Sequence, residues 1–229
     1  MKGGGNSSCY PAFNSIAKLY PSPVHAANRP CRRRLFSKGT VRPMQIPSRK
    51  ECISLLVRTE MPEHIQKHSV LVAEVTLYLG RLLNRNGALL DLALLEASAL
   101  LHDIGKPASL ATGQDHAALG ARMLEGFGYD LLAPIVREHI WLEPAQVEGP
   151  ITESLLVNYS DKRVRHDRIV LLEDRFEDLI ARYARTETHA VKFREKLGVY
   201  RALESGIFSH LAINPAGPEI MGLGNGANS

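Results

Sequence analysis

The sequence predicts an all-α protein, a bundle of helices, and three observations lead to this fold class. Between Ser48 and Phe208, apolar residues recur at the three- and four-residue spacing of amphipathic helices. No stretch shows a convincing period-two alternation, so little sheet is expected. Glycine and proline punctuate the helical patterns where connecting turns are needed. The 229 residues, 45% of them apolar, suit one domain or one domain with tails.

The first four helices are expected before residue 126. The first covers about 48–58, and the second follows Pro62 and ends near Asn84. The third covers about 89–102 and is apolar nearly all round, which is typical of a central buried helix. The fourth covers about 115–125, with Asp115 as the candidate N-cap.

Four further helices are expected up to residue 204. They cover about 131–140, 151–164, 168–185 and 188–204. Pro134 is compatible with the first of these because a proline is tolerated in the first turn of a helix.

The two ends of the chain differ from the helical part in composition. Ten of the 28 basic residues and none of the 24 acidic residues lie in residues 1–50, so the remainder has a net negative charge. We predict a disordered basic tail over 1–46, a helical domain over 47–208 and a flexible tail over 209–229. For the basic tail, a transit peptide, an over-extended start and a weak contact with nucleic acid or anionic lipid stay open.

Composition also excludes several classes of protein. Three scattered cysteines without a CxxC pair argue against a disulfide framework and against a thiolate zinc site. The most apolar stretch, 88–104, contains three acidic residues and is too short to span a bilayer. No clear signal peptide is present, so we expect a soluble cytoplasmic protein without membrane contact.

Imidazole and carboxylate groups fall on the inward faces of five expected helices. Six residues share this property: His68, His102, Asp103, His116, His139 and Asp161. Any one of them would ordinarily be a hydrogen-bonded core residue, but a buried carboxylate is costly unless it is paired or metal-bound. The joint pattern predicts a site for one or two divalent ions, with donors that suit Mn, Fe, Co, Zn or Mg.

The order of these residues resembles the HD-domain superfamily of metal-dependent phosphohydrolases. HDIGK at 102–106 is similar to the central motif, and HSVLVAEV from His68 and YSDK at 159–162 are similar to the flanking motifs. The resemblance covers about 61–185 and implies an HD-domain-like helical bundle around a metal centre. It implies that the first ion is held by four residues: His68, His102, Asp103 and Asp161. In members with two metals, Asp103 would bridge, and His116 and His139 match the additional histidines.

Two subgroups of the superfamily carry such an additional pair of histidines. They are cyclic-dinucleotide phosphodiesterases and diadenosine-tetraphosphate hydrolases. The chain departs from the first subgroup because it has no HHE…DG…GYP stretch after His116. A dinucleoside polyphosphate or a nucleoside phosphate is therefore the preferred substrate class, and cleavage of cyclic-di-GMP is not expected.

The predicted function is hydrolysis of a phosphate ester or anhydride, of a nucleotide, by metal-activated water. Asp103 and Lys106 are the predicted catalytic residues. Developing negative charge requires cations, so Lys106, Lys162 and Arg163 are predicted to bind phosphate. The alternatives are a non-catalytic regulatory module that binds a metal or nucleotide and, ranked last, a structural helical adaptor.

Two residues near the predicted site are expected to have structural roles. Gly105 is expected to supply a tight turn that presents Lys106. Arg175 is expected to pair with an acidic neighbour, Glu173 or Asp178.

Overall fold

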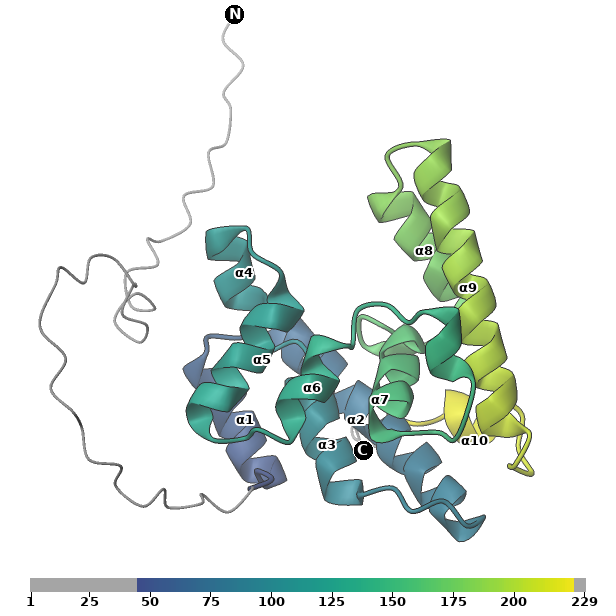
Figure 1. The fold of residues 1–229 in the computed structure, drawn as a ribbon, viewed down its shortest axis with the longest axis horizontal. Helices are drawn as coiled ribbons and strands as arrows, with labels where there is room; N and C mark the ends of the chain where they lie inside the picture. The colour runs from purple at the N-terminus through teal and green to yellow at the C-terminus, as the bar shows by residue number, and fades with distance from the viewer. Residues whose placement is uncertain (1–44, 225–229) are drawn as a thin grey trace, which may run out of the picture. The chain divides into compact units, whose positions relative to one another are not determined.

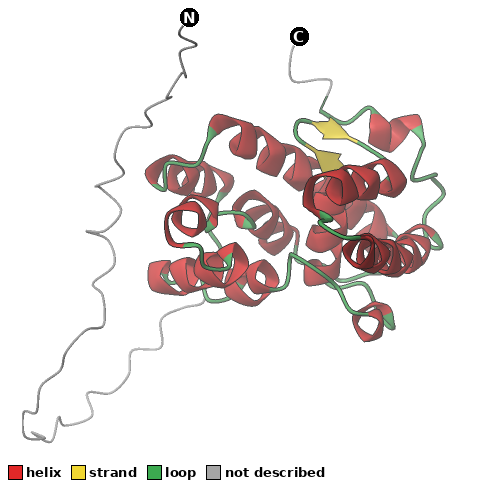
Figure 2. Cartoon of the chain, turned by 90° about the horizontal axis from the view of Figure 1, so that it is seen from above, coloured by secondary structure: helices red, strands yellow, loops and turns green. Residues whose placement is uncertain are grey.

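The computed structural model describes residues 45–224, and residues 1–44 and 225–229 are drawn as thin grey traces in Figure 1. The predicted basic tail therefore lies almost entirely outside the described residues. Within the described part, the chain consists of helices and a single antiparallel pair of two-residue strands (Figure 2). The predicted all-α fold class is confirmed.

The elements follow one another along the chain with short connections. They are α1 (Arg49–Arg58), α2 (Glu63–Arg85), α3 (Leu92–Leu101), α4 (Lys106–Thr112), α5 (His116–Phe127), α6 (Leu132–Arg137), η2 (Pro144–Val147), α7 (Glu153–Lys162), β1 (Val164–Arg165), β2 (Arg168–Ile169), α8 (Leu172–Tyr183), α9 (Glu187–Phe208) and α10 (Pro218–Met221). Among these helices, none combines the length and the apolar character that crossing a membrane requires.

Local sequence signals set where several helices begin. Ser48 forms a capping box with Glu51 at the start of α1, and Asp91 accepts hydrogen bonds from two backbone N–H groups of α3. Asp115 caps α5 as expected, accepting from the N–H of Ala118 at 2.7 Å. These caps fix the ends of the helices from which the site residues project.

The core forms around α2, which packs against α3 and α7. The α2 side chains Val72, Val75 and Leu79 are fully buried, as the helical spacing predicts. Helix α3 is buried over most of its surface, and Leu95, Leu100 and Leu101 are inaccessible to solvent. Two helix pairs, α5 with α6 and α8 with α9, complete the described bundle.

Several predicted element bounds differ from those in the structure. Residues 106–112 form helix α4, where the sequence analysis expects none, because Pro107 stands in the first turn and Gly113 ends the helix with φ of +70°. Helix α6 ends at Arg137, so His139 lies in the turn that follows. The expected helix over 168–185 starts at Leu172 because residues 164–169 form the β1–β2 hairpin.

The described part of the predicted C-terminal tail, 209–224, is folded against the bundle. It contains the short helix α10, and Ile220 is completely buried in the hydrophobic core. The carbonyl of Pro215 accepts a hydrogen bond from buried Arg163. Residues 209–224 thus supply apolar and polar partners to the core, and the flexibility expected of the C-terminal tail stays a prediction.

Candidate metal centre

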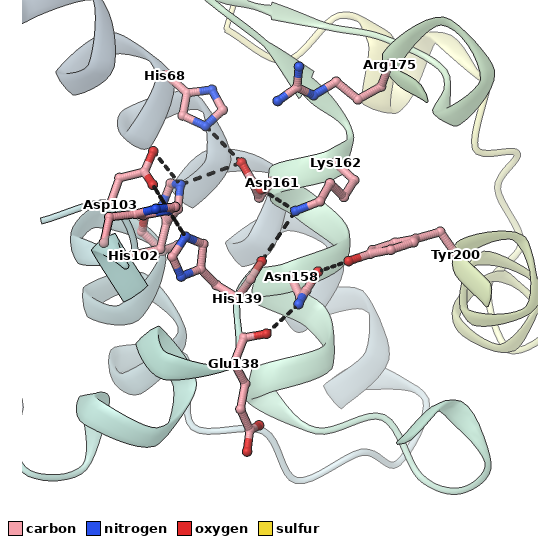
Figure 3. A network of polar contacts seen from close by, with 12 residues as sticks. His68, His102, Asp103, Glu138, His139, Asn158, Asp161, Lys162, Arg175 and Tyr200 are labelled. Atoms are coloured by element: carbon pink, nitrogen blue, oxygen red, sulfur yellow. Dashed lines mark hydrogen bonds and ion pairs between the residues drawn. The ribbon is translucent and has the colours of Figure 1, made fainter. Parts of the chain in front are cut away.

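Five parts of the fold bring the predicted metal ligands together. Helix α2 carries His68, and the residues after α3 are His102 and Asp103. His116 is the first residue of α5, His139 follows α6, and Asp161 lies in the last turn of α7. Figure 3 shows the His68, His102, His139, Asp103 and Asp161 side chains converging. His116 joins them, with its Nε2 3.2 Å from Nε2 of His139.

Asp103 lies at the centre of this cluster and is 2% exposed. Its Oδ2 is 3.2 Å from Nε2 of His102. Its Oδ1 is 3.3 Å from Nε2 of His139 and 3.5 Å from Nε2 of His116. The two oxygens of one carboxylate therefore face two different sets of histidines.

Two groups of ligand atoms could each hold a metal ion. One consists of His68, His102 and Asp103, and the other of Asp103, His116 and His139. Asp161 is in neither group. Its Oδ1 is 3.0 Å from Nε2 of His68 and 3.6 Å from Nε2 of His102, so it lies beside the first group.

The orientation of two histidine rings tests whether these residues fit a cation. Nδ1 of His102 is 2.8 Å from the carbonyl of Ala99, and Nδ1 of His139 is 2.6 Å from the carbonyl of Val136. A carbonyl oxygen only accepts, so each Nδ1 donates, and in the neutral ring the lone pair is on Nε2.

Both Nε2 atoms point toward the Asp103 carboxylate, and the buried Nε2 of His102 has no hydrogen-bond partner within residues 45–224. A lone pair facing a carboxylate is repulsive unless a proton or a metal ion lies nearby. A ring whose Nδ1–H is held by a carbonyl is also the usual arrangement of a metal-binding histidine. The residues present therefore fit a divalent cation.

The electrostatics keep most of these groups in the state that binds metal. Burial raises the pKa of both Asp103 and Asp161, but neighbouring cations outweigh it and hold each pKa well below the ordinary value. For Asp103 the main cation is His102, followed by Lys106, and for Asp161 it is Lys162. Both carboxylates are therefore ionised.

The surroundings of the histidines shift their pKa values in opposite directions. Burial lowers the pKa of His68, and it lowers the pKa of His116 to about 4, so both rings are neutral at pH 7. Burial also acts on His102, but Asp103 and Asp161 outweigh it and raise its pKa to about 10. Without a metal ion, the His102 ring is therefore protonated at pH 7, and binding of a metal ion at Nε2 would release that proton.

Two predicted phosphate-binding lysines lie at the cluster, with different exposure. Lys106 Nζ is 2.6 Å from Oδ2 of Asp103, and its side chain is 37% exposed. Lys162 is buried, with Nζ 2.6 Å from Oδ2 of Asp161 and 3.3 Å from the carbonyl of His139. Its ammonium also lies over the rings of Trp141 and Tyr200. Both lysines line the cavity beside the cluster, but Lys106 is the more exposed of the two, whereas Lys162 is buried against Asp161.

Arg163 does not reach the cluster, which corrects its predicted role as a phosphate ligand. Its side chain is completely buried, and its nitrogens donate to five acceptors: the carbonyls of Val170 and Pro215, the Tyr159 hydroxyl, Glu204 and the Met221 sulfur. Because Asp161 and Arg163 are two residues apart on a helix, their side chains leave α7 in different directions. Arg163 ties α7 to α9 and to the C-terminal segment.

Arg175 is a residue whose contribution the sequence analysis missed. It pairs with Asp178 at 3.1 Å, as one of the two expected alternatives, but it also lines a cavity beside the cluster. In Figure 3 its guanidinium is directed to the side of the cluster where His68 and Asp161 lie. The signal was present in the sequence, because Arg175 shares a helical stripe with Leu172, Phe176 and Leu179, which are buried.

A cavity of about 610 Å³ opens onto the cluster. Its polar wall includes Asp103, Lys106, His116, His139 and Asp161. Much of the remaining lining is apolar or aromatic: Ile65, Leu110, Ile140, Trp141, Leu179, Tyr183 and Phe193. Trp141 packs edge-on against Phe193, with ring centroids 5.4 Å apart. The cavity thus combines an ionic floor with an apolar wall, as small-molecule sites commonly do.

The chain is thus a helical protein, and its buried histidine–aspartate cluster is a candidate metal centre. The sequence profile of the HD domain family matches residues 65–179, half of the chain, and the chain belongs to this family. The family is a superfamily of metal-dependent phosphohydrolases, and its members bind divalent metals.

The chain is also similar to an uncharacterized protein of Methanocaldococcus jannaschii. The two are 29% identical over 130 residues, which cover 53% of this chain and 76% of that protein. No solved structure matches the chain significantly. The matched family range, 65–179, contains all six clustered residues.

Proposed function

We propose that this protein is a phosphohydrolase that cleaves a phosphate ester or anhydride bond of a nucleotide. The observation that carries the proposal is the division of the Asp103 carboxylate between two sets of histidines. His68, His102, Asp103 and Asp161 would hold a first divalent ion, and Asp103, His116 and His139 would hold a second.

When bound, divalent ions at such a site act as Lewis acids and make water a stronger nucleophile near neutral pH. The protein contributes by orienting the ligands and by binding the substrate. The carbonyls of Ala99 and Val136 fix the rings of His102 and His139. Lys162 holds the Asp161 carboxylate, so that Asp161 faces His68 and His102.

Lys106 is the proposed cation for the scissile phosphoryl group. Its side chain lines the cavity and is the more exposed of the two lysines at the cluster. Its Nζ contacts Oδ2 of Asp103 at 2.6 Å, so a phosphoryl oxygen that approaches Asp103 also approaches this ammonium. A positive charge fixed at that point stabilises the charge that develops as the bond breaks.

The apolar wall of the cavity supports a nucleotide as the substrate. Trp141 and Phe193 offer aromatic surface to the same cavity that contains the cluster. A nucleotide has a charged phosphate and a flat base, which match the ionic and aromatic sides of this cavity.

The first test combines metal analysis with turnover. The purified full chain is reconstituted with Mn, Fe, Co, Zn or Mg, and its metal content and its hydrolysis of p-nitrophenyl phosphate and nucleotides are measured. About two ions per chain are expected in the unaltered protein and about one in H116A or H139A. The double variant H102A/D103A should lose turnover.

A matched control replaces His189, an exposed histidine of α9, with alanine and should change nothing. Metal binding without turnover of any phosphate ester would favour the alternative, a regulatory module that binds metal or nucleotide. Absence of bound metal after reconstitution with all five ions would contradict the proposal.

A further inference from the structure

A second cavity, of about 230 Å³, adjoins the candidate metal centre. It shares Ile65, Lys106, Arg175 and Tyr183 with the larger cavity. The other residues that line it are three histidines and one arginine: His64, His68, His166 and Arg182. None of the described residues that line it is acidic, so this hollow is suited to an anion.

One carboxylate outside the lining aligns the two arginines. Asp178 accepts from Nη1 of Arg175 at 3.1 Å and from Nε of Arg182 at 2.9 Å. A single negative charge thus holds two guanidinium groups, which leaves a net positive charge at the cavity. Nε of Arg175 is buried and has no hydrogen-bond partner among the described residues. An unpaired buried donor is costly, and an anion in the cavity would relieve that cost.

The hairpin between β1 and β2 supplies a further donor at the rim. His166 has φ of +57°, a left-handed conformation that is uncommon for a residue with a side chain. Its Nε2 is 2.8 Å from Nη2 of Arg182. A guanidinium only donates, so Nε2 accepts and the ring proton is on Nδ1. This hydrogen bond orients the ring, and no residue of the described part of the chain accepts from its Nδ1–H.

We propose that this second cavity binds a second phosphoryl group of the substrate, next to the phosphoryl group that reacts. The inference rests on the proposed function, because the two cavities share Lys106 and Arg175 beside the metal cluster. It narrows the substrate to a compound with two neighbouring phosphoryl groups, such as a nucleoside bisphosphate or polyphosphate. Arg175, between the cavities, contacts both groups, and Arg182, His64 and His166 contact only the second.

Binding of non-hydrolysable phosphonates tests this subsite without any need for turnover. The full chain loaded with Mn²⁺ is titrated calorimetrically with methylphosphonate, methylenebisphosphonate and phosphonoacetate. R182A and H64A are compared with the unaltered protein. Both residues are exposed, so their replacement should leave the fold intact. R194A is the matched control, since it also removes an exposed, ion-paired arginine, and Arg194 lines neither cavity.

The two substitutions at the subsite should weaken the binding of the bisphosphonate but not that of the monophosphonate. R182A should weaken the binding of methylenebisphosphonate about tenfold, as loss of one charge-assisted hydrogen bond would. H64A should weaken it about threefold, as loss of one neutral hydrogen bond would. The affinity for methylphosphonate should change by less than about twofold in every variant. R194A should bind all three phosphonates as the unaltered protein does.

Three outcomes would overturn the inference. Chelation of the metal by the bisphosphonate depends on neither residue, so an unchanged affinity in R182A and H64A would remove the subsite. An equal loss for methylphosphonate would make these residues part of the first phosphoryl site. Tighter binding of phosphonoacetate than of methylenebisphosphonate would assign the subsite to a carboxylate. A chain that binds these probes as expected but hydrolyses nothing would contradict only the proposed function.

Discussion

Lys162 and Arg163 are neighbours in sequence, and both are buried cations, but they serve different partners. Lys162 contacts Asp161 and the carbonyl of His139, so it belongs to the cluster. Arg163 is committed to acceptors in α7, α9 and the C-terminal segment. A cation that follows a metal-binding aspartate cannot be assigned to substrate from its position alone, because one residue turns a side chain by 100° on a helix.

Replacing Lys162 with methionine should destabilise the protein substantially. The change keeps the length of the side chain and removes the ammonium, which leaves the ionised Asp161 carboxylate buried without its strongest cation. Breaking a buried pair in this way typically costs about 3 kcal/mol or more. Urea unfolding of the metal-free protein measures the loss.

The matched control is K67M, which removes an exposed lysine paired with Glu63 at 2.8 Å. That variant should change the free energy of unfolding by less than about 1 kcal/mol. Equal effects of K162M and K67M would show that Lys162 is not a buried structural cation.

Cys52 gives a prediction about pH, because its thiol is completely buried. Burial, with smaller contributions from Glu96 and Glu51, raises its pKa from 9.0 to about 12. Between these values the folded state keeps a proton that the unfolded state releases, so stability must fall as pH rises. The slope should be about 1.4 kcal/mol per pH unit within that window.

Unfolding of the unaltered chain and of C52A, followed from pH 8 to pH 11, measures this contribution. The steeper decline above pH 9 should be missing in C52A. Native protein at pH 8 should also resist alkylation at Cys52, as read by mass spectrometry of its peptide. Rapid alkylation under native conditions would contradict the buried environment.

At the scale of elements, α4 and α5 meet at two glycines. A Cβ on Gly105 would lie 2.1 Å from the carbonyl oxygen of His116 and 2.5 Å from the backbone nitrogen of Gly120. Gly105 lies in the turn before Lys106, as expected, but its φ of −79° is open to any residue, so what requires a glycine here is the close approach. This approach places the first residue of α5, His116, beside Asp103.

Substitution of Gly105 by alanine should therefore disrupt both stability and the cluster. The new methyl group meets backbone atoms that cannot rotate away, so α4 and α5 must separate. We expect a loss of about 3 kcal/mol in stability and weaker metal binding at the His116 side of the cluster. Thermal unfolding and metal analysis measure the two effects.

G126A is the control within α5, because a Cβ at Gly126 meets no atom within 4 Å. An alanine there should leave stability unchanged or raise it by up to about 1 kcal/mol. If G105A behaved like G126A, the two helices would not depend on this contact.

The sequence predicted most helices because the apolar spacing that defines them also buries them. The α2 face with His68, Val72 and Val75 is an example, since its period alone places His68 inward. Helix α4 was missed because it has only seven residues, too few for a period to emerge. The inward positions of the six clustered residues were predictable, but the partners of Lys162, Arg163 and Arg175 were not, since they come from distant parts of the chain.

At the scale of the described molecule, the segment after α9 closes the core next to the site. Ile220 is fully buried, and Arg163 donates to the carbonyl of Pro215 and contacts the Met221 sulfur. Arg163 adjoins Lys162 and Asp161 at the end of α7. The C-terminal segment is therefore connected to the cluster through one buried guanidinium, although no residue of the segment lines either cavity.

Truncation after His210 should lower stability by several kcal/mol relative to a chain truncated after Gly224. The shorter chain loses the buried Ile220 side chain and leaves Nη2 of Arg163 without its acceptor, each of which costs about 1–3 kcal/mol or more. The longer chain keeps all of these contacts. Urea unfolding of both forms measures the difference, and metal content shows whether loss of the Arg163 acceptor reaches Asp161. Equal stability of the two truncated chains would mean that residues 211–224 do not support the core.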